Sequence, residues 1–288
     1  MSARHIVLTV VALLVIVTAT TGLFLLDRAN SGVGAAAGPT EEELASVDAV
    51  RITLLLKRID TSSSTAVADV LVEPLGTLAD RNGRFARAAS VDLSTYRTDP
   101  ITATPGRIPS VEERRIAVTG TAIDYPFDRY RMSVVVAAND PSGRPVAATI
   151  LVEDSADSFA VKPISQSSDA GELEVDLTAK RTVPSIVFAG FVMLLMYGVA
   201  AAAVTATFYV LHVHRGLLFP ACSMLAAMLF ALPPLRHQVP GDPEPPMGSL
   251  IDFIAFFPAE AVVALSLISA VLGGFVVERR SATSVEGG

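Results

Sequence analysis

The sequence predicts a membrane protein of the α+β class: four transmembrane helices, with an extracytoplasmic antiparallel β-sandwich-like domain inserted between helices one and two. Three observations predict this class. Long apolar runs fill both ends of the 288-residue chain, polar residues crowd its middle third, and apolar residues alternate with polar ones there. With 51% hydrophobic and 18% charged residues, the composition argues against both a disordered chain and an ordinary soluble domain.

The first predicted element is a transmembrane anchor over residues 1–26. Ile6 to Leu26 is a run of 21 uncharged residues, which as a helix reaches about 31 Å and matches a bilayer core of about 30 Å. Arg4 and His5 precede the run, as in a secretory signal, but the apolar region of a signal is only about 7–15 residues long. We therefore expect an uncleaved helix. Residues 27–46, rich in Gly, Ala and Glu, predict a flexible linker.

The period-two alternation of half-buried strands predicts a β domain over residues 47–182. Its apolar positions are Val50, Ile52, Leu54 and Leu56, then Ile116 and Val118, then Met132, Val134 and Val136, and last Leu173, Val175 and Leu177. Turn signals containing Pro and Gly separate these groups, so we expect seven or eight short antiparallel strands around one core.

Three further apolar runs predict a three-helix transmembrane domain over residues 183–277, followed by a cytoplasmic tail over 278–288. The runs are Pro184 to Leu211, Leu217 to Leu235 and Phe253 to Val277. Four helices put both termini and the turn at Arg215 on one side, together with Arg4, Arg279 and Arg280. By the positive-inside rule this side is the cytoplasm, so residues 27–182 are expected to lie outside the cell (plasma) membrane.

The residues absent from the β domain exclude several enzyme classes. Residues 27–182 contain no histidine and no cysteine, so neither a Ser–His–Asp nor a Cys–His site can be built there. Glu153, Asp154 and Asp157 are expected to form a solvated turn rather than a calcium site. We expect no metal, no cofactor and no enzyme activity. The net charge of −7 argues against nucleic-acid binding, which requires a basic surface.

One candidate intramembrane polar site consists of Glu260, within the last predicted helix, with Arg236 and Asp252 at the ends of the loop before it. An ionisable residue at membrane depth is costly, so Glu260 is expected to be paired or functional. Arg236, at the outer end of the third helix, is its expected partner. A structural contact and an ion- or proton-linked site both remain open.

The second candidate is the corner formed by Tyr125, Pro126, Phe127 and Asp128. Pro126 fits the start or edge of a strand, and Phe127 is expected in the core. The alternative interpretation of the corner is a contact between the β domain and the membrane helices.

Two stretches carry a resemblance to a known family. They are Tyr125 to Tyr130, and the proline-rich segment from Ala231 to Glu260. Together with the helix layout they resemble an actinobacterial integral membrane protein family catalogued as domain of unknown function 4436, over about Val47 to Val277. The resemblance implies a membrane protein and supplies no activity. The corner is also similar to that of pentameric ligand-gated channels, but here an additional helix precedes the domain and only three follow.

The leading functional hypothesis is a non-enzymatic envelope protein whose outer β domain binds a protein or wall component. The alternative is a transporter or channel component that uses intramembrane Glu260. Expected partners are the lipid bilayer and either an envelope protein or a second copy of the chain in a homo-oligomer; nucleic acid is not expected.

Overall fold

The computed structural model describes residues 21–22, 34–97, 99–107, 109, 111–154, 158–169, 171–212, 218–241 and 244–286. The predicted anchor over residues 1–26 lies outside this part, apart from Thr21 and Gly22. The chain divides into two compact units. One comprises Met1–Ala122 and Phe127–Pro184 and is rich in β structure; the other comprises Ile123–Pro126 and Ser185–Gly288 and is helical.

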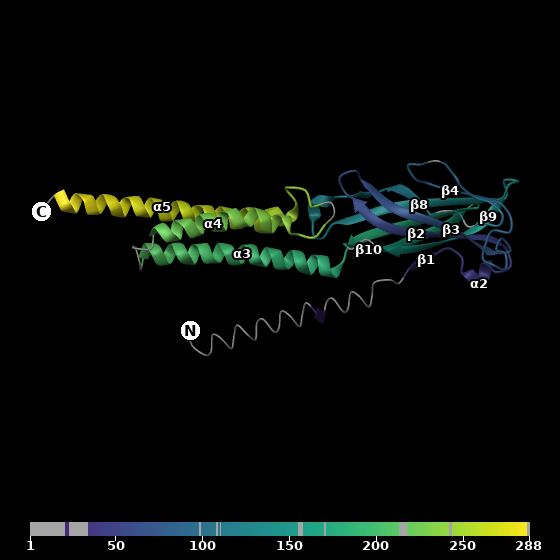
Figure 1. Cartoon of the computed structure of the whole chain (residues 1–288), viewed down its shortest axis with the longest axis horizontal. Helices are drawn as coiled ribbons and strands as arrows, with labels where there is room; N and C mark the ends of the chain where they lie inside the picture. Colours follow the sequence, from purple (N-terminus) through teal and green to yellow (C-terminus); the bar gives the residue numbers. More distant parts are fainter. Residues whose placement is uncertain are drawn as a thin grey trace. The chain divides into compact units, whose positions relative to one another are not determined.

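The β-rich unit contains eleven strands in its described part, together with one short helix (Figure 1). These elements are β1 (Ala35–Ala37), α2 (Glu41–Leu44), β2 (Asp48–Asp60), β3 (Thr65–Gly76), β4 (Ala89–Leu93), β5 (Ile101–Ala103), β6 (Glu112–Ala117), β7 (Thr119–Gly120), β8 (Arg129–Asn139), β9 (Pro145–Asp154), β10 (Phe159–Asp169) and β11 (Glu172–Arg181).

The strands form one connected, curled sheet with the main order β10-β11-β8-β9-β2-β3-β6. The prediction of a β-rich domain is confirmed, but the expected seven or eight strands are too few, because β1, β5 and β7 are only two or three residues long and carry little alternation. The pairing is also not wholly antiparallel. Strand β2 pairs in parallel with β9, from Ala49 opposite Ala147 to Leu56 opposite Asp154.

The core of this sheet is formed by the apolar residues that the period-two alternation predicted to face inward. Val50, Ile52 and Leu54 of β2 are fully buried, and the inward positions of β8 and β11 are buried in the same way. A register shift between Leu56 and Arg58 adds one residue to β2, so that Ile59 is buried although its parity is opposite to that of Leu56.

The predicted linker over residues 27–46 is ordered in its described portion. Ala35–Ala37 forms β1 and pairs with β9. Gly38, with φ of 103°, donates its N–H to Oε1 of Gln166 at 2.7 Å. Helix α2 follows with a capping box between Thr40 and Glu43. Small residues predict a flexible segment in isolation, but here a neighbouring strand supplies hydrogen-bond partners for their backbone.

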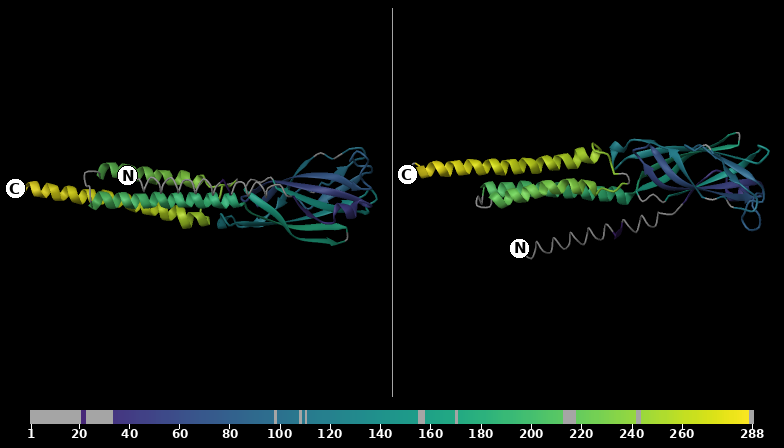
Figure 2. Two further views of the ribbon diagram at one scale, coloured as in Figure 1. Left: turned by 90° about the horizontal axis from the view of Figure 1, so that it is seen from below. Right: turned by 45° about the horizontal axis from the view of Figure 1, so that its top comes forward.

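The described part of the helical unit contains three long helices, which run roughly side by side in Figures 1 and 2. They are α3 (Val183–His212), α4 (Leu218–His237) and α5 (Phe257–Glu286), the last preceded by a π-helical turn (Asp252–Phe256). A short 3-10 turn (Ala122–Asp124) lies at the boundary of the two units.

Three of these helical segments are long and apolar enough to cross a membrane: Val183–His212, Leu218–His237 and Asp252–Val276. The three later predicted spans are therefore confirmed as candidates. Helix α4 continues past Pro233 and Pro234, which brings Arg236 into its last turn.

Candidate functional site

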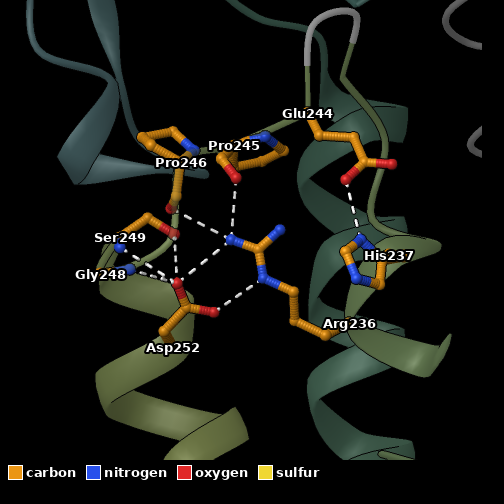
Figure 3. A network of polar contacts seen from close by, with 8 residues as sticks. All are labelled: Arg236, His237, Glu244, Pro245, Pro246, Gly248, Ser249 and Asp252. Carbon is orange, nitrogen blue, oxygen red and sulfur yellow. Dashed lines mark hydrogen bonds and ion pairs between the residues drawn. The ribbon is translucent and has the colours of Figure 1, made fainter. Parts of the chain in front are cut away.

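The first cluster joins the end of α4 to the start of the next helix, and Arg236 lies at its centre (Figure 3). The Arg236 guanidinium donates from Nε to Oδ1 of Asp252 at 2.9 Å and from Nη2 to Oδ2 at 3.1 Å. Nη2 also donates to the carbonyl oxygens of Pro245 and Pro246, at 2.8 and 3.0 Å. The two charged side chains are almost fully buried, with 3% and 0% exposed.

Asp252 also serves as an acceptor for the turn before its helix. Its Oδ2 accepts the backbone N–H groups of Gly248 and Ser249, at 2.8 and 3.1 Å, and the Ser249 hydroxyl at 3.3 Å. A carboxylate is favoured at this position, because the first N–H groups of a helix have no partner within it. Gly248, with φ of 85°, provides the left-handed turn that aims these amides at Asp252.

Two further contacts hold the proline-rich connection between α4 and the π-helical turn. His237 Nδ1 lies 2.9 Å from Oε2 of Glu244, and both side chains are more than half exposed. Tyr125, which is fully buried, donates its hydroxyl to the carbonyl oxygen of Pro240 at 2.8 Å. Residues 123–126 thus belong to the helical unit, although they interrupt the β-rich unit in sequence.

The structure brings Arg236 together with Asp252 and not with Glu260, the partner expected from the sequence. Glu260 is eight residues beyond Asp252, about 12 Å farther along a helix. Its side chain is partly exposed, and within the described part of the chain it has no hydrogen bond or ion pair. Asp252 is the nearer carboxylate, and the amides of Gly248 and Ser249 orient it toward the guanidinium.

The second cluster is a buried ion pair in the β-rich unit, between Asp128 and Arg181. Arg181 Nε donates to both carboxylate oxygens at 3.0 and 3.1 Å, and its Nη2 donates to Oδ2 at 3.0 Å. The side chains are 0% and 3% exposed. The guanidinium also lies over the ring of Phe159, 4.1 Å from its centroid, which adds a cation–π contact.

Tyr130 completes this cluster by donating its hydroxyl to Asp128 Oδ2 at 2.8 Å. Burial, together with the neighbouring Asp128 carboxylate, raises the pKa of the Tyr130 hydroxyl well above its usual value near 10. The Tyr130 ring meets the Phe159 ring edge to face, with 5.5 Å between centroids. The arrangement is a buried network of hydrogen bonds and charge, of the kind that fixes one conformation of a strand end.

The expectation that Phe127 lies in the core is wrong, since its side chain is 60% exposed. The buried aromatic residue of the corner is Tyr125. In β8 the inward positions are Tyr130, Met132 and Val134, so the same parity turns Asp128 inward and Phe127 outward.

Sequence reasoning missed Arg181, although a signal for it was present. The inward positions of β11 are Leu173, Val175, Leu177 and Ala179, and the next position of that parity is Arg181. Lys180 pairs with Arg129 and Ala179 with Tyr130, so continuing the register sets Arg181 opposite Asp128. Two opposite charges at inward positions of predicted neighbouring strands would have indicated the pair.

The fold therefore defines a class: a β-rich domain combined with apolar helices long enough to cross a membrane. Residues 40–179 match the family described as Domain of unknown function (DUF4436). Residues 181–276 match a separate family, Domain of unknown function (DUF8686). The expected match to domain of unknown function 4436 is confirmed for the β-rich part, but the helical part, expected under the same family, matches the second one. A comparison with curated proteins finds no match.

Proposed function

We propose that this chain is a non-enzymatic integral membrane protein of the cell envelope, whose β domain binds a protein or wall component outside the cytoplasm. The supporting observation is that its buried charged side chains form ion pairs with a structural role. In the described part of the chain, Asp128 with Arg181 and Asp252 with Arg236 are buried pairs that tie strand ends and loops together. Buried polar groups arranged in this way stabilise a shape rather than activate a nucleophile.

Membrane insertion is supported by the large apolar side chains that the helices expose. Such an extensive apolar surface is unfavourable in water and favourable in lipid. The most exposed aromatic side chains of the three candidate spans are Phe208, Phe219, Phe230, Phe253 and Phe275, each at least 60% exposed.

The proposed topology has four spans, with the first over residues 1–26 and both termini in the cytoplasm. The β domain, proposed to be sandwich-like, then lies outside. Arg4, Arg215, Arg279 and Arg280 fall on the cytoplasmic side in this arrangement, in agreement with the positive-inside rule.

The β domain is proposed as the binding part because it presents exposed apolar side chains beside an edge strand. Tyr96 is 64% exposed, and its N–H donates to the carbonyl oxygen of Arg115 in edge strand β6 at 3.0 Å. Val111, just before β6, is 54% exposed. Tyrosine is enriched at protein interfaces, since it combines a large apolar body with a polar tip.

Site-specific photocrosslinking in intact cells tests this proposal. A benzophenone amino acid at position 96 or 111 of the full chain is expected to capture the same partner, identified by mass spectrometry. The control position is Phe219 in α4, which is expected to capture lipid or membrane-embedded partners. Absence of any shared adduct at positions 96 and 111 in cells that express the protein at its natural level contradicts the proposal.

The alternative is a transporter or channel component that uses Glu260. It is supported by the π-helical turn at Asp252–Phe256, since such turns interrupt helices at many functional sites. Glu260→Gln removes the charge at nearly constant shape. In liposomes containing the purified chain, an ion or proton flux abolished by this change favours transport, whereas no flux above that of empty liposomes argues against it.

A further inference from the structure

Four basic side chains gather at one end of the sheet, on three neighbouring strands. Lys180 of β11 pairs with Arg129 of β8. Two residues away along the same strands, Thr178 of β11 pairs with Arg131 of β8 and with Lys162 of β10. Residues that pair directly, or lie two positions apart on one strand, point to the same face of a sheet. Arg129, Arg131, Lys162 and Lys180 therefore share one face, and all four are exposed. We call these four residues the basic rim.

The charges of the basic rim are not neutralised within the described part of the chain. None of the four side chains has an ion pair there, and Arg129 lies directly opposite Lys180. Like charges in directly opposite positions destabilise a sheet. The carboxylates of the same face are farther along the strands, where Glu174 accepts a hydrogen bond from Ser133 and Asp176 from Ser165. This arrangement is notable in a protein of net charge −7.

Chain connectivity places the basic rim close to the membrane surface. Lys180 is three residues before Val183, the first residue of α3, so the chain keeps the two within about 11 Å. Helix α3 has 30 residues. At about 1.5 Å per residue it is about 45 Å long, the thickness of a bilayer that includes its headgroup layers. Val183 therefore lies near the headgroup level.

The corner residue Phe127 belongs to the same end of the sheet. It immediately precedes Asp128, and the buried pair of Asp128 with Arg181 fixes it beside the last residues of β11. Its ring is 60% exposed, and Val183 is 57% exposed. Exposed aromatic and apolar side chains next to cations are typical of surfaces that contact the membrane interface.

We propose that the basic rim, with Phe127, binds the anionic phosphate headgroups of the lipid leaflet from which α3 emerges. The phosphates neutralise the Arg129–Lys180 repulsion and fix the β domain at the membrane surface. This inference rests on the membrane insertion of α3 in the proposed function, but not on the partner that the β domain binds or on which side of the membrane the domain lies.

The absence of tryptophan from the sequence provides a clean test. Phe127→Trp introduces a single indole at the rim. The full-length F127W protein is reconstituted into vesicles of phosphatidylcholine alone, or of phosphatidylcholine and phosphatidylglycerol in equal amounts. We expect a blue-shifted emission, quenched by lipids brominated near the headgroup, that is stronger in the anionic vesicles. The difference should disappear at 1 M salt, where the Debye length falls to about 3 Å.

Charge removal decides whether the basic rim is responsible. The substitutions R129Q, R131Q and K180Q, combined in the F127W chain, should abolish the difference between the two vesicle types, since each cation near an anionic surface contributes about fivefold to binding. The matched control replaces three exposed arginines outside the basic rim: R81Q, R84Q and R107Q. This control should keep the difference in full.

Several outcomes would overturn the inference: equal emission in both vesicle types, a difference retained by the rim variant, or a difference lost equally in the control. Circular dichroism verifies folding; if the combined rim variant is unfolded, K180Q and R129Q alone make the same comparison. Resistance of the reconstituted protein to alkaline extraction measures membrane insertion separately. Failure of insertion is thus distinguished from failure of headgroup binding.

Discussion

Removal of the Asp128 carboxylate is expected to destabilise the β-rich unit strongly. In the folded chain, Asp128 accepts three hydrogen bonds from Arg181, at 3.0 to 3.1 Å, and one from Tyr130, at 2.8 Å. Asp128→Ala removes the carboxylate that pairs with the guanidinium of Arg181, a residue that is only 6% exposed. Breaking a buried pair in this way costs about 3–5 kcal/mol, a large share of the roughly 5–15 kcal/mol that stabilises a typical domain.

Hydrogen exchange with mass spectrometry measures this loss in the full chain. Peptides from β8 and β11 should exchange about 10²- to 4 × 10³-fold faster where their amides exchange through opening of the whole unit, because 1.4 kcal/mol corresponds to a factor of ten. Asp99→Ala is the matched control. Its ion pair with Arg97 is exposed on both sides, so its loss should cost less than about 1 kcal/mol.

The reasoning is refuted if Asp128→Ala and Asp99→Ala give the same exchange. A second variant separates charge from packing. Asp128→Leu combined with Arg181→Met replaces the pair by apolar side chains and should recover most of the stability, as buried pairs often can be replaced in this way. A double variant as unstable as the single one would show that shape, not charge, accounts for the loss.

The remaining predictions concern the helical unit, the Tyr130 titration and the topology. In thermal unfolding of detergent-solubilised protein, Asp252→Ala should lower the stability far more than His237→Ala. Asp252→Ala leaves the buried Arg236 without its carboxylate partner, whereas the His237 contact is exposed. Equal effects of the two substitutions contradict this. Because the pKa of Tyr130 is raised in the folded chain, Tyr130 should remain protonated when exposed tyrosines ionise near pH 10. Its contribution to stability should be present below pH 10 and lost as the pH rises through the folded pKa. Ultraviolet titration of the wild type and of Tyr130→Phe measures this. If Tyr130 stays protonated, the two proteins show the same absorbance change between pH 10 and 11. A smaller change in Tyr130→Phe contradicts the prediction. Finally, a cysteine at the exposed position Asn82, in a Cys222→Ser background, should react with an impermeant reagent in intact cells, and protection there contradicts the proposed topology.

The candidate site was only partly predictable from the sequence. Arg236 and Asp252 were identified as candidates, since charges at the ends of apolar runs are few. Their pairing was not predicted, because it depends on how the proline-rich connection folds and on where Gly248 and Ser249 direct their amides. Glu260 was a candidate only because it lies deep within a predicted membrane span, and this position does not determine which carboxylate pairs with an arginine.

The sequence by itself determined the division into alternating and continuously apolar segments, because side-chain periodicity and run length are local properties. It thereby predicted the buried faces of β2, β8 and β11 and the three later helices. The tertiary structure decided the parallel pairing of β2 with β9, the assignment of Tyr125 to the helical unit, and the outward direction of Phe127. Each depends on contacts between residues distant in sequence, where strand register and available hydrogen-bond partners, rather than local preference, determine which side chain is buried.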